Sequence, residues 1–233
     1  MPTVVVTGAS QGIGRAIALA YAGHEGTRLA LLARNEATLR SVADECARLG
    51  AEAEAVRCDV TDEAQIARAA ERVHGAFGPA DVLVNNAGVF TPGSFLETTP
   101  EAFRQQVEVN LTSAFLVTRA FLPAMLERRS GDIVFMASVA SLRGYPGGAA
   151  YGAAKHGLLG LARTLREETK EQGVRVIAVM PGATLTPSWE GVDLPPDRLM
   201  PPEAIAQTVV AATSLPRTAV VEEILIRPQL GDL

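Results

Sequence analysis

The sequence predicts an α/β protein built on one doubly wound parallel sheet of about seven strands, with helices on both faces. Two observations lead to this fold class. Short apolar runs alternate with amphipathic helix patterns along all 233 residues, which is typical of repeated βαβ units. The apolar runs are continuously rich in Val, Ile and Leu, as in parallel strands buried on both faces. No linker, repeat or low-complexity stretch interrupts the pattern, so we expect a single domain over residues 1–233.

Each element is expected from its own pattern. The expected strands are Thr3–Thr7, Arg28–Ala33, Glu52–Arg57, Asp81–Asn85, Asp132–Ala137, Arg175–Met180 and Glu222–Arg227. The expected helices are about Gly12–Ala22, Glu36–Leu49, Glu63–Phe77, Pro100–Arg129, Ala150–Gln172 and Pro202–Leu215. Two long segments without a helix pattern, Ala87–Thr99 and Gly182 to about Pro201, each follow a strand. They are expected at the carboxyl edge of the sheet, where open α/β sheets bind ligands.

Composition excludes several classes of protein. Hydrophobic residues make up 48%, charged residues 20%, and the formal net charge is −5, so no basic surface for nucleic acid is expected. The chain starts in a strand pattern, and its apolar runs are interrupted before membrane-spanning length, which favours a cytoplasmic protein outside membranes. The two cysteines, Cys46 and Cys58, lack metal-binding spacing and are expected to be inert thiols, with no metal site.

A glycine-rich turn joins the first strand to the first helix. Small residues let the backbone approach a diphosphate, and the helix N-terminus offers free N–H groups. The spacing is Gly-x-x-x-Gly-x-Gly, and its place between strand and helix indicates a dinucleotide site of the Rossmann type, with a purely structural turn as the alternative. The cofactor-binding positions expected here are Gly8, Ser10, Gln11, Gly12, Ile13 and Gly14.

The end of the second strand favours NADP over NAD. An acidic residue there would bind a ribose 2′-hydroxyl, whereas a basic residue would bind a 2′-phosphate. Arg34 occupies the position, and its guanidinium can bind a phosphate with help from Ser10 and Asn35. Two alternatives remain open: Arg34 as an exposed helix-leading residue, and Glu36 as the acidic residue of an NAD site.

Tyr151 and Lys155 are the candidate acid–base pair. A spacing of four on a helix places the phenol and the ammonium side by side. A neighbouring cation favours the phenolate and lowers the phenol's pKa towards the working range. The alternative is an amphipathic surface pair without chemical function.

With these motifs in place, the chain resembles the short-chain dehydrogenase/reductase family from Thr3 to about Thr186. Further motifs of that family follow in its order, after successive expected strands. They are Asp59-Val60, Asn85-Asn86-Ala87-Gly88, Asn110, Ser138 and Pro181-Gly182. Together they are highly specific, and the resemblance implies a Rossmann fold and a nicotinamide cofactor, NADP (NADPH), with NAD less favoured.

The resemblance implies a catalytic set of Asn110, Ser138, Tyr151 and Lys155. Tyr151 would exchange a proton with the substrate, and Lys155 would lower its pKa and bond the nicotinamide ribose. Ser138 would hold the substrate oxygen, and Asn110 would anchor a water linking Lys155 to solvent. Ser141 remains a rival for the hydroxyl role, and Asn110 could instead be satisfied locally within its helix.

The resemblance also implies the remaining cofactor contacts. Asp59 and Val60 would meet the adenine, and Asn86, Ala87 and Gly88 would line the adenosine ribose. Tyr151 and Lys155 would contact the nicotinamide end. The carboxamide contacts would be Pro181, Gly182, Thr184 and Thr186, of which Thr184 departs from the family's usual Val or Ile.

The substrate is less defined. The family implies a carbonyl or secondary alcohol, and Arg143 could pair with an anionic one. The ending Ile224–Leu230 is more similar to the branch acting on hydroxy acids and small carbonyls than to the acyl-carrier-protein ketoreductase branch. The family implies a homodimer or homotetramer. A non-catalytic dinucleotide sensor is the alternative function, and a sugar-nucleotide epimerase is a third. The candidate pocket walls are Phe90, Phe95, Leu142, Tyr145, Pro146 and Trp189. Core packing is an equal alternative for Phe95 and Leu142, and Trp189 is expected either to cap the substrate as a lid or to pack against a neighbouring subunit.

Overall fold

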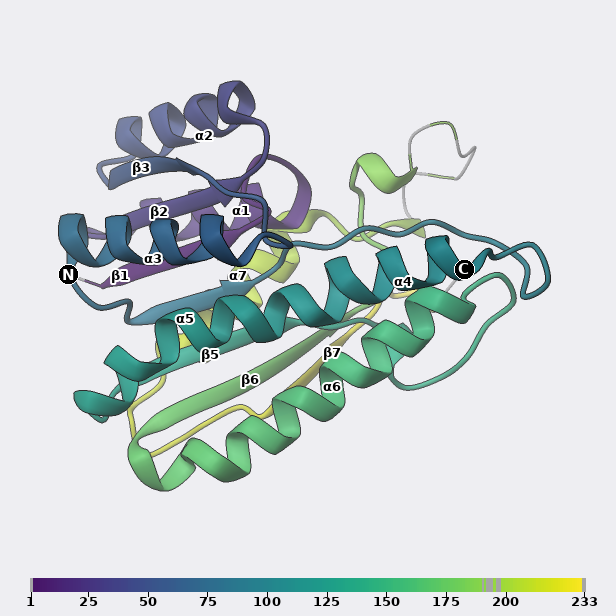
Figure 1. Cartoon of the computed structure of the whole chain (residues 1–233). Coiled ribbons are helices and arrows are strands. Elements are labelled where there is room, and N and C mark those ends of the chain that lie inside the picture. The colour runs from purple at the N-terminus through teal and green to yellow at the C-terminus, as the bar shows by residue number, and fades with distance from the viewer. Residues whose placement is uncertain (1, 190, 192–194, 196–197, 232–233) are drawn as a thin grey trace.

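The computed structural model describes residues 2–189, 191, 195 and 198–231. It confirms the predicted fold class: the described part of the chain contains one seven-stranded sheet in the order β3-β2-β1-β4-β5-β6-β7, with every neighbouring pair parallel (Figure 1). The strands are β1 Thr3–Thr7, β2 Arg28–Ala33, β3 Glu52–Arg57, β4 Val82–Asn85, β5 Gly131–Met136, β6 Val174–Pro181 and β7 Glu223–Ile226.

Helices cover both faces of the sheet, as Figure 1 shows. The α-helices are α1 Gly12–Ala22, α2 Glu36–Arg48, α3 Glu63–Phe77, α4 Pro100–Val107, α5 Ser113–Glu127, α6 Ala149–Thr169 and α7 Pro202–Thr213. Apolar residues of α1, α2 and α7 pack with one face of the sheet, and those of α3, α5 and α6 with the other. The five inner strands therefore have core on both sides, which explains their apolar sequences. The edge strands β3 and β7 are only partly covered, and Glu52 and Leu225 are exposed.

The order of the strands creates a crevice at one edge. From β1 the chain builds outward to β2 and β3, then returns to β4 on the other side of β1. At such a switch point the following loops diverge, which opens a binding crevice outside the carboxyl ends of the strands. The loops after β1 and β4 carry the glycine-rich turn and the Asn85–Gly88 motif.

The helix expected over Pro100–Arg129 is divided in the structure. A π-helical turn, η1 at Glu108–Thr112, separates α4 from α5, and the Ser113 N–H donates to the Glu108 carbonyl. The predicted single α-helix was wrong here, because amphipathic periodicity does not reveal one inserted residue. π-turns of this kind are often found at functional sites, and Asn110 lies within this one.

The run Pro100–Glu127 is long and apolar enough to cross a membrane by length and composition, with a mean hydropathy of 1.4 over its most apolar window. Arg104, Glu108 and Arg119 interrupt it, as expected of the apolar runs in this sequence. Its second half packs as a core helix, with Val117, Phe121 and Met125 buried. The core helix of a globular protein can be equally long and apolar, so length and composition are weak evidence for a membrane span here.

Two loops at the carboxyl edge are fastened to their neighbours. The loop after β4 forms a bridge to the segment before α6, where the Gly93 N–H donates to the Gly147 carbonyl over 3.0 Å. The loop after β6 is closed at its base by a bridge between Thr184 and Met200. The predicted non-helical segments are thus largely loops, although η4 (Pro187–Trp189) is a short 3₁₀ turn. Part of the expected segment beyond it lies outside the described residues.

At the opposite, amino edge lies a buried ionic cluster. The Asp132 carboxylate accepts two bonds of 2.7 Å from Arg175, through Nε and Nη2, and one of 2.6 Å from Arg217. The Asp132 and Arg175 side chains are 5% and 8% exposed. Arg175 also donates to the carbonyls of Thr213 and Ala219, so the cluster fastens the connection between α7 and β7 to the sheet.

Candidate active site

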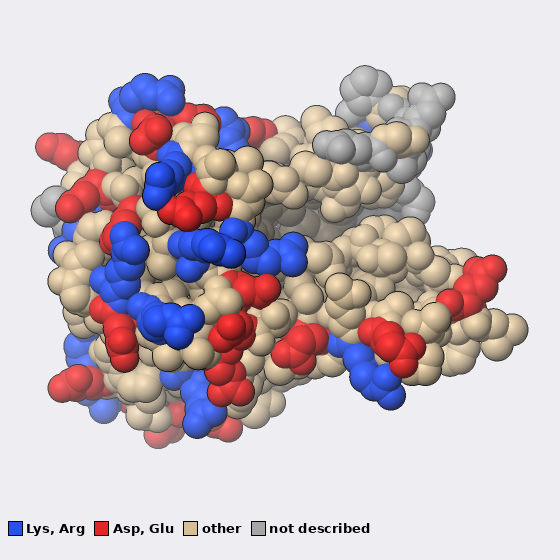
Figure 2. Space-filling view, turned by 45° about the horizontal axis from the view of Figure 1, so that its top comes forward, with Lys and Arg blue, Asp and Glu red and all other residues tan. Residues whose placement is uncertain are grey.

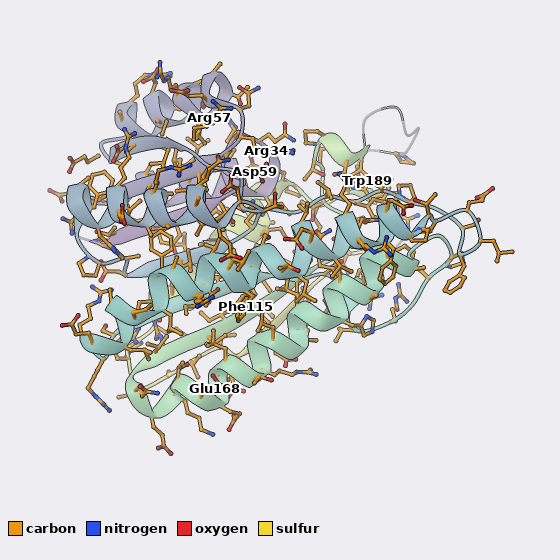
Figure 3. The ribbon with its side chains drawn as sticks, viewed as in Figure 1. Arg34, Arg57, Asp59, Phe115, Glu168 and Trp189 are labelled. Atoms are coloured by element: carbon orange, nitrogen blue, oxygen red, sulfur yellow. The ribbon has the colours of Figure 1, made fainter. Side chains whose placement is uncertain are left out.

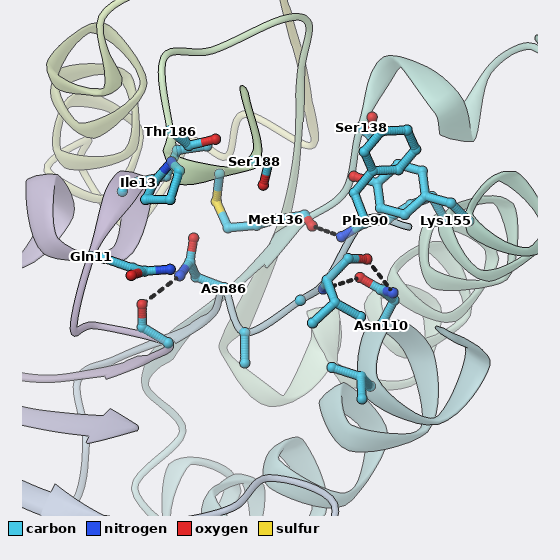
Figure 4. A pocket seen from close by; sticks show the side chains of 18 of the residues that line it. Gln11, Ile13, Asn86, Phe90, Asn110, Met136, Ser138, Lys155, Thr186 and Ser188 are labelled. Carbon is cyan, nitrogen blue, oxygen red and sulfur yellow. Dashed lines mark hydrogen bonds between the residues drawn. The ribbon is translucent and has the colours of Figure 1, made fainter. Parts of the chain in front are cut away.

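A cavity of about 1150 Å³ occupies the carboxyl edge (Figure 4). It brings together every residue of the predicted catalytic and cofactor sets except Gly14. Figure 4 places Gln11, Ile13 and Asn86 at one end of this cavity and Phe90 and Ser138 at the other. The first is called the cofactor end below, and the second the substrate end.

The cofactor end is formed largely by backbone. Gly8 has φ of +65°, and a Cβ there would lie 2.9 Å from the Ala87 Cα. A Cβ at Gly14 would lie 2.3 Å from the Gly8 carbonyl oxygen, so Gly14 acts by close packing behind the turn and does not line the cavity. Asn86 donates from Nδ2 to the Thr7 carbonyl over 2.9 Å.

Thr7 is a part of this end that sequence reasoning missed. Its hydroxyl accepts the N–H groups of Asn86 and Ala87 at 2.9 and 3.0 Å and donates to the Val84 carbonyl at 3.3 Å. It thereby ties the glycine-rich turn to the loop after β4. A threonine directly before the turn was the available signal, because its hydroxyl can satisfy loop N–H groups.

The residues fit a dinucleotide diphosphate. Helix α1 starts at Gly12, and its N-cap residue, Gln11, makes no side-chain capping bond. The first N–H groups of the helix therefore remain available for an anion. The close packing around Gly8 and Gly14 leaves the backbone accessible where a larger residue would fill the space.

Arg34 and Asp59 both line the cavity and lie near one another in the view of Figure 3. Asn35 is the N-cap of α2, where its Oδ1 accepts the Thr38 N–H. Glu36 is a first-turn residue paired with Arg40, the helix position expected for it. Thr38 also lines the cavity, as does Thr61, and neither was predicted.

Charges are mixed on the neighbouring surface. Figure 2 shows Lys and Arg side chains interspersed with Asp and Glu on this face. Beside β3, Arg40 pairs with Glu36 and Arg72 pairs with Glu54. This face is thus unlike the uniformly basic stripe typical of nucleic-acid binding.

The candidate catalytic side chains gather at the substrate end. Ser138 follows β5, whereas Tyr151 and Lys155 lie one turn apart on α6. The Ser138 hydroxyl lies near enough to the Tyr151 phenol to oppose the rise of its pKa. The Lys155 ammonium lies 5.5 Å from the centre of the Tyr151 ring and donates to the Met136 carbonyl over 2.8 Å. Tyr151 and Lys155 therefore share one face of the helix, as their spacing predicts.

Burial shifts the pKa values of both Tyr151 and Lys155 away from those of solvent-exposed side chains. Burial raises the pKa of Tyr151, an effect that the hydroxyl of Ser138 opposes. The net direction is opposite to the lowering expected from the neighbouring Lys155, because burial outweighs it in this structure. Burial also lowers the pKa of Lys155 to about 8. The phenol therefore stays protonated at neutral pH, a state suited to donating a proton, while the Lys155 cation titrates just above neutral pH.

Asn110 is held by three side-chain hydrogen bonds. Nδ2 donates to the carbonyls of Val89 and Gln106, both at 2.9 Å, and Oδ1 accepts the Val89 N–H at 3.1 Å. A Cβ at Gly88 would lie 2.7 Å from that Oδ1 and 3.7 Å from the Lys155 ammonium. Asn110 thus fixes the loop after β4 close to Lys155, and the expected proton-relay role remains a prediction.

Ser138 and Ser141 form a reciprocal pair around a 3₁₀ turn, η2 (Val139–Ser141). The Ser138 Oγ accepts the Ala140 N–H at 3.1 Å, and the Ser141 Oγ accepts the Ser138 N–H at 3.3 Å. Ser141 is 4% exposed and is absent from the cavity lining, whereas Ser138 is part of it. The geometry therefore favours Ser138 for contact with substrate and leaves Ser141 behind it.

The predicted pocket walls divide into two groups. Phe90, Tyr145 and Trp189 line the cavity, and so does Arg143. Phe95 is 82% exposed and Leu142 is 45% exposed, and neither lines the cavity, so the expectation was wrong for both. Pro146 is likewise absent from the lining. Sequence position at the carboxyl edge does not reveal which side of a loop faces inward. The lining residues that were not predicted include Gln105, Glu108, Val109 and Ser188.

The segment after β6 forms the remaining wall. Pro181, Gly182, Thr184 and Thr186 all line the cavity. The Thr184 hydroxyl donates to the Gly182 carbonyl over 3.0 Å, which turns this side chain towards its own loop. Thr186 lies close to the glycine-rich turn, since a Cβ at Gly12 would be 3.3 Å from its methyl group.

Comparison with known proteins places the fold and the site in one class. Residues 2–195 match the family model described as short chain dehydrogenase. The chain is 38% identical to the sepiapterin reductase of Chlorobaculum tepidum over 237 residues, which covers 99% of this chain and 97% of that protein.

Two solved structures are also similar over nearly the whole chain. One is an alcohol dehydrogenase from Thermococcus sibiricus complexed with 5-hydroxy-NADP, with a TM-score of 0.92, 32% identity and coverage of 98% and 97%. The other is a metagenomic short-chain oxidoreductase in complex with NADP, with a TM-score of 0.86, 38% identity and the same coverage. The chain therefore belongs to the short-chain dehydrogenase family and is an oxidoreductase of that family.

Proposed function

We propose that the protein catalyses NADPH-dependent hydride transfer between the nicotinamide and a carbonyl or secondary alcohol. The observation that carries the proposal is the meeting of Ser138, Tyr151 and Lys155 at one end of a cavity whose other end is a glycine-rich turn. A phenol, a hydroxyl and an ammonium gathered at one end of a cavity suit proton exchange with a carbonyl oxygen. When bound, the cofactor supplies the hydride.

The proposed cofactor is NADP(H), bound by the glycine-rich turn and by residues near the end of β2. Gly8, Gly12 and the N–H groups at the start of α1 would receive the diphosphate. Arg34 would receive the 2′-phosphate, with Ser10 and Asn35 beside it in the lining. Two similar solved structures contain NADP or an NADP analogue, which supports this choice over NAD.

The remaining cofactor contacts are proposed from the lining. Asp59 and Val60 would lie at the adenine, and Asn86, Ala87 and Gly88 would lie along the adenosine ribose. The carboxamide would contact the wall after β6. The residues proposed for that wall are Pro181, Gly182, Thr184 and Thr186.

In reduction, Tyr151 would donate a proton to the substrate oxygen. Its raised pKa keeps the phenol protonated until that oxygen becomes basic. Ser138 would hold the same oxygen, because its hydroxyl lies beside the Tyr151 phenol in the cavity lining. On substrate binding, its proton would turn from Tyr151 to the substrate oxygen, while its Oγ keeps the Ala140 N–H as a donor.

Lys155 would stabilise the phenolate left after that transfer. Its ammonium lies over the Tyr151 ring, and because Lys155 is only 4% exposed, its positive charge is weakly screened by solvent. Asn110 would keep the loop after β4 against this pair and, by the family pattern, would anchor the water through which the proton is replaced.

We further propose that residues 1–233 form one domain of a cytoplasmic homo-oligomer. The side chains of Phe103 and Phe115 on α4 and α5 are 40% and 47% exposed. On α6, Ala153 and Gly160 are also exposed, and small residues allow close helix packing. Light scattering of the purified protein distinguishes a monomer from a dimer or tetramer.

The deciding experiment is a spectrophotometric screen of NADPH and NADH against diketones, quinones, ketoesters and aldehydes, with hydroxy acids in the reverse direction. We expect turnover with NADPH. We expect Tyr151→Phe to lower kcat by about a hundred- to ten-thousandfold, the range for loss of a general acid, while NADPH still binds by fluorescence titration. Undiminished turnover in Tyr151→Phe would contradict the mechanism. Tight NADPH binding without turnover of any substrate would favour the non-catalytic sensor.

A further inference from the structure

Three aromatic rings from separate segments meet at the substrate end. Phe90 comes from the loop after β4, Tyr145 from the loop after β5 and Tyr151 from α6. The Phe90 and Tyr151 rings have centres 5.0 Å apart at an interplanar angle of 70°, an edge-to-face contact. The Phe90 and Tyr145 rings have centres 6.5 Å apart at 48°. The three rings form a cluster, called the aromatic wall below.

The aromatic wall remains partly open to the cavity. Phe90 is 37% exposed and Tyr145 is 38% exposed, and both line the cavity together with Tyr151. Figure 4 shows Phe90 beside Ser138 and Lys155 at this end. A substrate whose carbonyl oxygen reaches the Tyr151 and Ser138 hydroxyls can therefore place one of its substituents against Phe90.

Backbone contacts hold the two exposed rings in position. A Cβ at Gly148 would lie 2.5 Å from the Tyr145 ring, so this ring packs directly on the glycine backbone. The Gly148 N–H donates to the Tyr145 carbonyl at 3.2 Å, and the Gly93 N–H donates to the Gly147 carbonyl at 3.0 Å. The second bond joins the loop that bears Phe90 to the loop that bears Tyr145. The wall is therefore preorganised, which lowers the entropic cost of binding against it.

We propose that the site selects carbonyl substrates that carry a planar aromatic ring directly on the carbonyl carbon, in preference to saturated analogues of the same size. Aromatic side chains favour an aromatic ligand over a saturated one through edge-to-face and offset-stacked contacts. The aromatic wall offers Phe90 and Tyr145 at two different angles, so a flat ring can stack on one and meet the edge of the other. This inference rests on the proposed carbonyl reduction and adds the class of substrate.

The test compares a matched pair of ketoesters, ethyl benzoylformate and ethyl cyclohexylglyoxylate, in reduction by NADPH. The ratio of their kcat/KM values is divided by the ratio of their rates of reduction by borohydride, which removes the difference in intrinsic reactivity. We expect the wild-type protein to prefer the phenyl substrate by about two- to tenfold after this correction, the range for an added aromatic contact. A corrected ratio of one or less overturns the inference.

Variants then locate the preference. Phe90→Leu and Tyr145→Leu should each bring the corrected ratio towards one. Phe90→Leu is also expected to lower kcat for both substrates, because Phe90 contacts Tyr151, and only the ratio reports on ring recognition. Phe95→Leu is the matched control on the same loop, since Phe95 is 82% exposed and lies outside the lining, and it should leave the ratio unchanged.

The outcomes separate this inference from the proposed function. An unchanged ratio in both Phe90→Leu and Tyr145→Leu overturns the inference, provided that NADPH titration and thermal melting show folded variants. Turnover of other carbonyls but of neither ketoester also overturns it and leaves carbonyl reduction standing. Absence of NADPH-dependent turnover with every carbonyl contradicts the proposed function itself.

Discussion

The two edges of the sheet use polar side chains in different ways. At the carboxyl edge, Ser138, Tyr151 and Lys155 face a cavity, and the backbone around the glycine-rich turn leaves N–H groups available. At the amino edge, Asp132 and Arg175 are almost fully buried and bond to one another, and Arg175 also donates to surrounding carbonyls.

This difference assigns separate tasks to the two edges. Polar groups that face a cavity with unused hydrogen-bonding capacity can bind a ligand, whereas buried groups away from any cavity, such as Asp132 and Arg175, stabilise the fold through their internal partners. Loops after the strands carry the first kind, and strand residues at the amino edge carry the second. Changes at the amino edge should therefore alter unfolding without altering chemistry, and the reverse should hold at the carboxyl edge.

The largest effect is expected at the amino edge. Asp132→Ala leaves the Arg175 guanidinium buried without its carboxylate partner, although some carbonyl acceptors remain. Breaking a buried ion pair in this way lowers the free energy of unfolding by about 3–5 kcal/mol. Urea unfolding measures the loss, and kcat per folded molecule should stay at the wild-type value.

Arg217→Ala is the matched control at the same carboxylate. The Arg217 side chain is 44% exposed, so its loss should cost no more than about 1 kcal/mol. Equal losses in the two variants, or a large change in kcat per folded molecule for Asp132→Ala, would contradict the separation of tasks.

A smaller effect is expected at the carboxyl edge from Arg34→Ala. Losing charge-assisted bonds to a 2′-phosphate, worth about 1.5–3 kcal/mol, raises the KM for NADPH by about ten- to a hundredfold. The KM for NADH should change little, and stability should be unaffected because Arg34 is exposed. Steady-state kinetics with both cofactors measure the difference. Arg40→Ala is the control, since Arg40 pairs with Glu36 away from the cavity. An equal rise for NADPH and NADH would remove the assignment of Arg34.

The sequence predicted the carboxyl edge better than the amino edge, for a physical reason. The glycine-rich turn and the Tyr151–Lys155 pair are local patterns, so short spacings sufficed to place them. The amino-edge cluster joins Asp132 to residues 43 and 85 positions away, and nothing in the neighbouring sequence marks such a contact. The π-turn at Glu108–Thr112 was missed because it changes the helix by a single residue.

The directions in which loop side chains point were also not predictable from the sequence. Phe90 and Phe95 lie five positions apart in one loop, yet the first faces the cavity and the second faces solvent. Loops have no fixed periodicity, so residue type alone does not give the direction of a side chain. The aromatic wall at the substrate end therefore required the structure.

The pH dependence of reduction tests whether the carboxyl edge needs the charge of Lys155. Burial lowers its pKa to about 8 and raises that of Tyr151. As the pH rises through 8 the ammonium loses its charge while the phenol keeps its proton. The value of kcat/KM should therefore fall above about pH 8, by up to about tenfold per unit. Lys155→Arg, which keeps its charge, should move that fall to higher pH in whatever activity remains. A flat profile from pH 7 to 10 would show that the charge is not needed.

The smallest effect is expected from Ser141, which lies one layer behind the cavity. Ser141→Ala removes the acceptor for the Ser138 N–H, a hydrogen bond worth about 0.5–1.5 kcal/mol. If Ser141 is a positioning residue for Ser138, kcat should fall by about two- to tenfold, with the KM for NADPH unchanged. Ser141→Thr, which keeps a hydroxyl acceptor, should restore kcat. In a Ser138→Ala background, Ser141→Ala should have no further effect on kcat, because the group that it positions is already absent. Additive losses of kcat in the double variant would instead assign Ser141 a role independent of Ser138. The functional residues of the carboxyl edge would then include one that does not line the cavity.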